Sequence, residues 1–166
     1  MESLPLRLSP GSDLRASLED AVSSRSCAAA FVVSGIGSLR DARLRLAGAR
    51  EPETLRRDLE ILTLAGTVAS NGCHLHMSVA DSEGRVTGGH VARGCIVRTT
   101  AEVLLLLLSE WSLTREADPA TGFAERKRLA SLRSGIDYGT VRPPLTPITD
   151  DAALRRLADR IEGVPA

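Results

Sequence analysis

The chain has 166 residues, of which 43% are hydrophobic, so it is long and apolar enough to bury the core of one domain by itself. Its 21 basic and 21 acidic residues cancel, and this neutral balance argues against binding to nucleic acid through net charge. The leucine-rich run at residues 103–108 is too short to cross a bilayer, and the N-terminal residues lack the charged and then apolar pattern of a secretion signal.

The N-terminal segment predicts a strand followed by a helix. Residues 4–8 have the pattern of a short strand. Residues 13–25 predict an amphipathic helix that Ser12 or Asp13 caps, with four apolar side chains on one side: Leu14, Leu18, Ala21 and Val22. We expect this side of the helix to pack against the rest of the domain.

The next segments predict strands of a sheet. Residues 28–33 form a short buried strand, which the glycine-bearing sequence at residues 34–37 is expected to end. Residues 39–46 alternate like a strand with one solvent-facing side. Residues 59–69 are apolar and β-branched, as in a central strand.

A β-hairpin is predicted next, and it carries all three histidines of the chain. If residues 82–84 form a three-residue loop with Gly84 in the left-handed conformation, Asp81 opposes Arg85. That register places His76 directly opposite His90 and His74 diagonal to it, on one face. A two-residue turn would instead send His90 to the other face, because a slip of one residue reverses every side chain.

Three imidazoles on one face are the ligand set of an open zinc-type site. Three nitrogen ligands leave the fourth position of a tetrahedral Zn²⁺, or of another divalent transition metal, for water, a substrate or a carboxylate. We therefore predict that His74, His76 and His90 bind a metal. The competing interpretation is that one or two of them are ordinary surface or core histidines.

The three cysteines are an odd number and have no Cys-x-x-Cys spacing: Cys27, Cys73 and Cys95. Such cysteines are typical of buried thiols in a reducing compartment, so we expect a cytoplasmic protein. Cys73 adjoins the histidines but alternates onto the opposite face of the strand. It is therefore left out of the metal site.

Residues 95–108 fit two structures. Thr99, Thr100 and Glu102 before a run of leucines would suit the start of a helix, and an entirely apolar run fits a buried strand equally well. Glu102 is also a candidate catalytic acid beside the metal.

The C-terminal part carries one basic cluster and a proline-rich segment. Arg126, Lys127 and Arg128 are either a solvated strand edge or a small DNA-binding patch. Residues 142–147 contain three prolines and are predicted to form a linker. A final helix is expected to begin at Asp150 or Asp151 and to end at Gly163.

Four segments of the chain resemble the PPC family (plants-and-prokaryotes-conserved domain). The longest is the histidine hairpin, Gly72-x-His74-x-His76-x-Ser78-Val79-x-Asp81-x-x-Gly84-x-Val86-x-Gly88-Gly89-His90-Val91. Residues 31–42, 59–69 and 115–123 are similar to other family segments, so the resemblance extends from about Leu4 to about Leu132. We therefore divide the chain into a PPC domain at residues 1–141 and a linker with a C-terminal helix at residues 142–166.

The resemblance implies an α+β fold, with a mostly antiparallel twisted sheet and one or two flanking helices. It favours a strand at residues 95–108. It also implies a homotrimer with a histidine-bound metal, as in prokaryotic stand-alone members, and no AT-hook sequence occurs in this chain. The family fold is similar to that of acetolactate decarboxylase, which holds zinc with three histidines from a comparable hairpin.

Two functions follow from these observations. The first is a trimeric metalloprotein that binds or acts on a small carboxylate or ester, as a metal-dependent lyase or hydrolase would. The second is a DNA-binding or transcription-regulatory module in which the metal is structural. We expect no membrane partner for either function.

Overall fold

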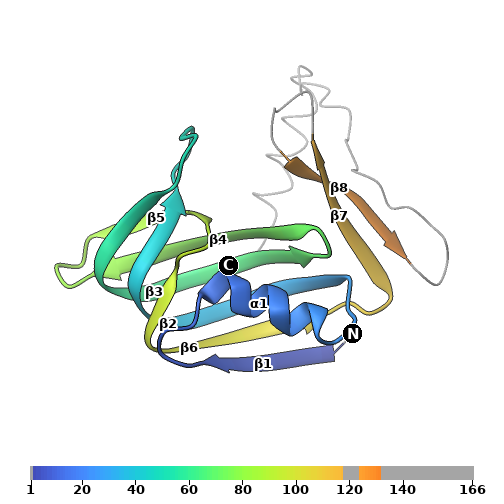
Figure 1. Ribbon diagram of the computed structural model, residues 1–166, viewed down its shortest axis with the longest axis horizontal. Coiled ribbons are helices and arrows are strands. Elements are labelled where there is room, and N and C mark those ends of the chain that lie inside the picture. The colour runs from blue at the N-terminus through green and yellow to red at the C-terminus, as the bar shows by residue number, and fades with distance from the viewer. Residues whose placement is uncertain (1, 118–123, 132–166) are drawn as a thin grey trace, which may run out of the picture.

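The computed structural model describes residues 2–117 and 124–131. These residues form one helix and two sheets (Figure 1). The elements are β1 (Glu2–Leu8), α1 (Leu14–Ser23), β2 (Ala29–Arg45), β3 (Glu53–Ala69), β4 (Gly72–Asp81), β5 (Val86–Val91), β6 (Ile96–Leu107), β7 (Trp111–Ala117) and β8 (Ala124–Ser131). The predicted linker at residues 142–147 and the predicted C-terminal helix lie outside the described residues.

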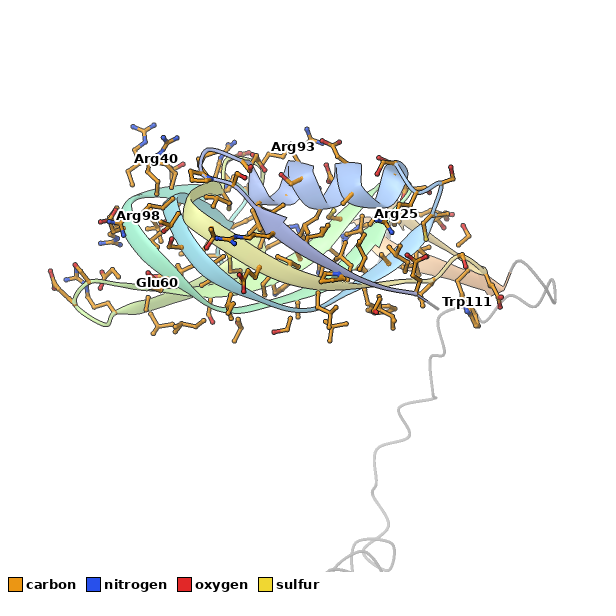
Figure 2. The ribbon with its side chains drawn as sticks, turned by 90° about the horizontal axis from the view of Figure 1, so that it is seen from below. Arg25, Arg40, Glu60, Arg93, Arg98 and Trp111 are labelled. Atoms are coloured by element: carbon orange, nitrogen blue, oxygen red, sulfur yellow. The ribbon has the colours of Figure 1, made fainter. Side chains whose placement is uncertain are left out.

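Six antiparallel strands form the main sheet in the order β1-β6-β2-β3-β4-β5. The end of β2 also pairs with β5, so the sheet curls until its sixth strand meets its third. Helix α1 covers one face of this sheet (Figure 2). The predicted α+β fold with a mostly antiparallel sheet is confirmed.

Helix α1 begins where the sequence places its cap. The Asp13 carboxylate accepts a hydrogen bond from the Ala16 backbone N–H at 3.0 Å and a second from the Gly94 N–H at 2.6 Å. The first bond satisfies an N–H of the first helical turn, and the second ties the helix start to the turn before β6. Leu14, Leu18 and Val22 are buried against the sheet, as predicted.

The core lies between α1 and the sheet. It is built from aliphatic side chains that alternate with exposed ones along each strand. On β6, for example, Ala101, Val103 and Leu105 are buried whereas Glu102 and Leu104 are exposed. The strand interpretation of residues 95–108 is therefore confirmed, and the helix interpretation is wrong, because β6 is held between β1 and β2 on both edges.

The prediction that residues 34–37 end a strand is wrong. Residues 29–45 form one continuous strand, β2, and the glycine-bearing stretch lies inside it. Its pairing with β6 shifts register between Val32 and Ser34 and again between Gly37 and Leu39. Such bulges increase the twist of a strand without ending it, which explains why glycines here mark a bend and not a turn.

The face of the sheet opposite α1 is open within the described part of the chain. Four large aliphatic side chains lie on it, each 39–57% exposed: Val33, Ile36, Leu62 and Leu104. Such a cluster on a surface is typical of a contact with another protein chain.

Strands β7 and β8 form a separate hairpin that extends away from the main sheet (Figure 1). Asn71, in the turn between β3 and β4, attaches β7 to the main sheet. Its side chain donates a hydrogen bond to the Arg115 carbonyl at 2.7 Å and accepts one from the Arg115 N–H at 3.0 Å. The Arg115 guanidinium also donates to the Cys73 carbonyl at 3.3 Å.

No helix in the described part of the chain is both long and apolar enough to span a membrane.

Candidate metal centre

The hairpin of β4 and β5 has the predicted three-residue loop. Gly84 has a φ of +76°, and its N–H donates to the Asp81 carbonyl at 2.9 Å. The Asp81 N–H donates to the Arg85 carbonyl at 3.1 Å, so Asp81 opposes Arg85. The Asp81 carboxylate also accepts hydrogen bonds from the backbone N–H groups of Glu83 and Arg85, each at 3.0 Å. These bonds fix the loop length, and with it the register.

The register brings the three histidines together. His76 is directly opposite His90, as predicted, and His74 lies two residues before His76 on the same face of β4. The His74 and His76 Nε2 atoms are 3.1 Å apart, and one nitrogen from each of the three rings lies within 4.8 Å of the others. The ring centroids are 5.1–5.5 Å apart.

These separations are close to what a single metal ion requires. With Zn–N bonds of about 2.0–2.1 Å, two nitrogens bound to one tetrahedral Zn²⁺ lie roughly 3.3 Å apart. The His74–His76 pair already meets this distance, and a His90 nitrogen lies within 4.8 Å of the other two. The donor set, three imidazoles with no carboxylate or thiolate, also suits Zn²⁺ and its neighbours in the periodic table.

Strand β3 pairs with β4 along the edge opposite β5 and thereby supports the two histidines of β4. Thr67 is the partner of His74 and Ala65 is the partner of His76. Gly66, between them, has a φ of +143°, and a Cβ atom placed there would lie 2.0 Å from the His74 carbonyl oxygen. Only glycine allows β3 to approach β4 this closely at the metal centre.

Cys73 lies on the face opposite the histidines, as predicted. Its side chain is buried beneath α1, next to the Glu19 carboxylate. Burial, followed by the Glu19 charge, raises the pKa of the Cys73 thiol to about 12. The thiolate is the form of cysteine that binds metals, so this thiol is a poor ligand in both geometry and protonation.

His90 is held in its neutral form. Partial burial, followed by the charges of His74 and Arg45, lowers the pKa of His90 to about 4. A metal-binding imidazole must be neutral, so this low pKa keeps His90 ready to bind at neutral pH.

The other candidate residues are not brought to the histidines within one chain. Glu102 lies on β6, paired with Ile36 of β2 and Arg7 of β1. Strands β2 and β3 separate it from β4, a distance of roughly 14 Å at about 4.8 Å per strand. Glu102 instead borders a shallow groove of about 470 Å³ on the open face, and its catalytic role stays a prediction. The backbone of Arg126, Lys127 and Arg128 belongs to β8, whereas their side chains lie outside the described residues.

Arg45 also lies beside the histidines, and the sequence alone does not predict it there. This residue ends β2 and is the partner of His90 across the β2–β5 pairing. No local pattern reveals it, because the pairing joins segments far apart in the chain. The pairing of β5 with β2 follows from the curl of the whole sheet, which neither segment reveals by itself.

Residues 1–109 match the sequence model of the Plants and Prokaryotes Conserved (PCC) domain. The chain belongs to this family. The predicted resemblance is thereby confirmed, and the match covers both the histidine hairpin and the strands that support it.

Relatives of known sequence and structure agree with this assignment. The chain is 47% identical over 121 residues to the bifunctional protein GlmU of Synechococcus sp. (strain JA-3-3Ab), a match that covers 73% of this chain and 20% of the relative. This chain therefore spans about one fifth of the length of that curated relative. A hypothetical protein from Salmonella cholerae-suis is 34% identical with a TM-score of 0.74, covering 78% of this chain and 94% of that one.

Two further structures carry names that bear on function. The metal-containing protein AF0104 from Archaeoglobus fulgidus is 29% identical with a TM-score of 0.64, covering 76% of this chain and 93% of that one. A suspected DNA-binding protein from Bacteroides thetaiotaomicron is 21% identical with a TM-score of 0.68, covering 75% and 91%. At this identity, the second likeness shows the fold alone.

Proposed function

We propose that this protein is a metalloprotein whose three histidines hold one Zn²⁺ or another divalent transition metal and present it to a small carboxylate or ester. The observation that carries the proposal is the convergence of His74, His76 and His90 within 4.8 Å on one rigid hairpin. The metal-containing relative from Archaeoglobus fulgidus, which shares the fold and 29% of its residues, supports it.

The three imidazoles determine what the centre could do. A metal held by three neutral nitrogens would lower the pKa of a bound water and polarise a ligand oxygen, the chemistry of a metal-dependent lyase or hydrolase. His76 is exposed and the other two rings are half-buried, so a small molecule can reach the centre from solvent.

Metal analysis of the purified protein tests this proposal. We expect one divalent ion per chain in the native protein and none in the His76→Ala variant. Cys73→Ala is the matched control, because Cys73 is the neighbour of His74 but faces the opposite side, and this variant should keep its metal. A protein with all three histidines replaced that still binds one ion per chain would place the site elsewhere.

We also propose that the protein is a homotrimer. The open face exposes several aliphatic side chains, among them Ile36, to solvent. Contact with other copies of the chain would bury this apolar surface. Light scattering should give a trimer mass for the native protein. Ile36→Glu should reduce the mass, and a monomer mass for the native protein at micromolar concentration contradicts the proposal.

A DNA-binding or regulatory module with a structural metal is the second candidate. The basic cluster Arg126-Lys127-Arg128 favours it. Against it, several arginines already pair with acids: Arg40 with Asp41, Arg57 with Asp81, and Arg98 with Asp58. Sequence-selective, sub-micromolar binding of duplex DNA at physiological salt in a gel-shift titration would favour this candidate over the first.

A cytoplasmic location completes the proposal. Cys27, Cys73 and Cys95 are all free and buried, which suits a reducing compartment. Cell fractionation tests it directly.

A further inference from the structure

Arg45 lies beside the metal centre on the same face of the sheet. Arg45 and His90 are partners across β2 and β5, and directly opposed residues of antiparallel strands point to the same side. The preceding pair, Leu44 and Val91, is fully buried on the other side. His90 is therefore flanked by His76 on β4 and by Arg45 on β2, one strand spacing away on either side.

A glycine permits this close pairing. A Cβ atom at Gly89 would lie 2.8 Å from the Arg45 carbonyl oxygen, so any side chain there would push β5 away from β2. The Ala92 N–H donates to the Arg43 carbonyl at 3.0 Å and extends the contact past the end of β5. The position of Arg45 relative to the histidines is thus set by backbone contacts and not by a flexible loop.

The Arg45 side chain has the charge and the donors to bind an anion. It is half-buried, its guanidinium donates a hydrogen bond to the Ala49 carbonyl at 3.3 Å, and its positive charge contributes to the lowered pKa of His90. A guanidinium has five N–H donors in a planar fork, so a bond to Ala49 is compatible with a two-pronged bond to a carboxylate.

One side of the His90 ring has no neighbouring side chain on β5. Gly88 lies two residues before His90 on the same face and opposes Ser78, so no side chain of β5 stands beside the ring on that side. His76 is exposed. A molecule bound at the centre could therefore lie across His90 toward Arg45.

We propose that Arg45 is the anion-binding residue of this centre and holds the carboxylate of a small organic acid. Another oxygen of the same acid, outside the carboxylate, would face the metal. This inference rests on the proposed metal-binding function and names the chemical class of its ligand. Arg45 and His90 are partners one strand spacing apart, so a short acid with a second oxygen close to its carboxylate is the simplest ligand to reach both residues.

Cobalt-loaded protein provides the test, since the visible spectrum of Co²⁺ reports a change in its ligands. The probes are lactate, which has a carboxylate beside a hydroxyl, its neutral methyl ester, and inorganic phosphate. We expect lactate to bind the native protein more tightly than the other two. In Arg45→Gln the lactate affinity should fall roughly 10- to 100-fold, the loss expected for a charged hydrogen bond, with the methyl ester affinity and the cobalt content unchanged.

Two further variants sharpen the result. Arg45→Lys keeps the charge but not the fork and should lose less affinity than Arg45→Gln. Arg40→Ala, earlier on the same strand, removes an exposed arginine that pairs with Asp41 and should bind lactate like the native protein.

Four outcomes overturn the inference. If Arg45→Gln binds lactate normally, or if phosphate binds more tightly than lactate, Arg45 does not select a carboxylate. If Arg45→Gln and Arg45→Lys both lose cobalt, Arg45 supports the structure of the centre instead. A native protein that binds no cobalt contradicts the proposed metal centre itself. This failure is distinct from the other three, which concern Arg45.

Discussion

The close approach of β3 to β4 beside His74 can be tested by a substitution that adds a single methyl group. In Gly66→Ala, the new Cβ would lie 2.0 Å from the His74 carbonyl oxygen and 2.9 Å from the Leu75 Cα. Because Cβ atoms essentially never approach another atom within 3.0 Å, the carbonyl must move back by at least 3.0 − 2.0 = 1.0 Å. That movement shifts His74 relative to His76 and His90 and strains the pairing of the two strands.

The energetic cost has two parts. A non-glycine residue held at a φ of +143° costs on the order of 1–3 kcal/mol, and a weakened ladder hydrogen bond adds about 1 kcal/mol. We therefore expect Gly66→Ala to lower the free energy of unfolding of the metal-free protein by about 2–4 kcal/mol in urea titrations. Its metal affinity, measured by competition with a chromophoric chelator, should also fall.

Gly72→Ala is the matched control. Gly72 has a similar φ of +132°, but a Cβ atom there meets nothing within 4 Å. The control should therefore lose some stability through backbone strain and yet bind metal normally. If Gly66→Ala binds metal as tightly as Gly72→Ala, the contact between β3 and the His74 carbonyl has no role in shaping the centre.

Three other predictions follow from the packing and the charges. First, burial lowers the pKa of His90 to about 4 while an unfolded histidine titrates near 6.5, so the metal-free protein should be fully stable above about pH 6.5 and lose stability as the pH falls toward 4. Because His90 is only partly buried, we expect a loss of roughly 1–2 kcal/mol, which His90→Asn should lack in urea titrations at the two pH values. Second, Leu18→Ala removes a fully buried side chain of α1 and should cost about 2–5 kcal/mol without changing the metal content, whereas a loss below 1 kcal/mol would mean that α1 contributes little to the core. Third, the Glu19 charge raises the pKa of Cys73, so Glu19→Gln should lower that pKa, and an unchanged pH profile of thiol alkylation would argue against their contact.

The convergence of the three histidines could be predicted from sequence because their register is determined within one hairpin. The spacing of His74 and His76 places them on one face of a strand, and Gly84 selects the loop length that puts His90 opposite His76. Both rules operate within a single hairpin. The cap of α1 at Asp13 is predictable for the same reason, since a side chain next to the first helical turn determines it.

The parts that could not be predicted depend on pairings between distant segments. The glycines of residues 34–37 suit a turn and a bulge equally well, and only the long pairing of β2 with β6 decides for the bulge. The run at residues 95–108 has no periodicity that separates helix from strand, so its structure depends on its position between β1 and β2. Likewise, the separation of Glu102 from the histidines is a property of strand order.

Arg45 shows what strand order contributes to the centre. A two-stranded hairpin by itself is marginally stable in water, so β4 and β5 need the rest of the sheet to keep three imidazoles in place. Gly66 lets β3 support one edge of the hairpin, and Gly89 lets β2 meet the other. The contact between β2 and β5 also places the positively charged Arg45 next to His90. The hairpin thus brings the three histidines together, and the curl of the sheet both supports them and places Arg45 next to His90.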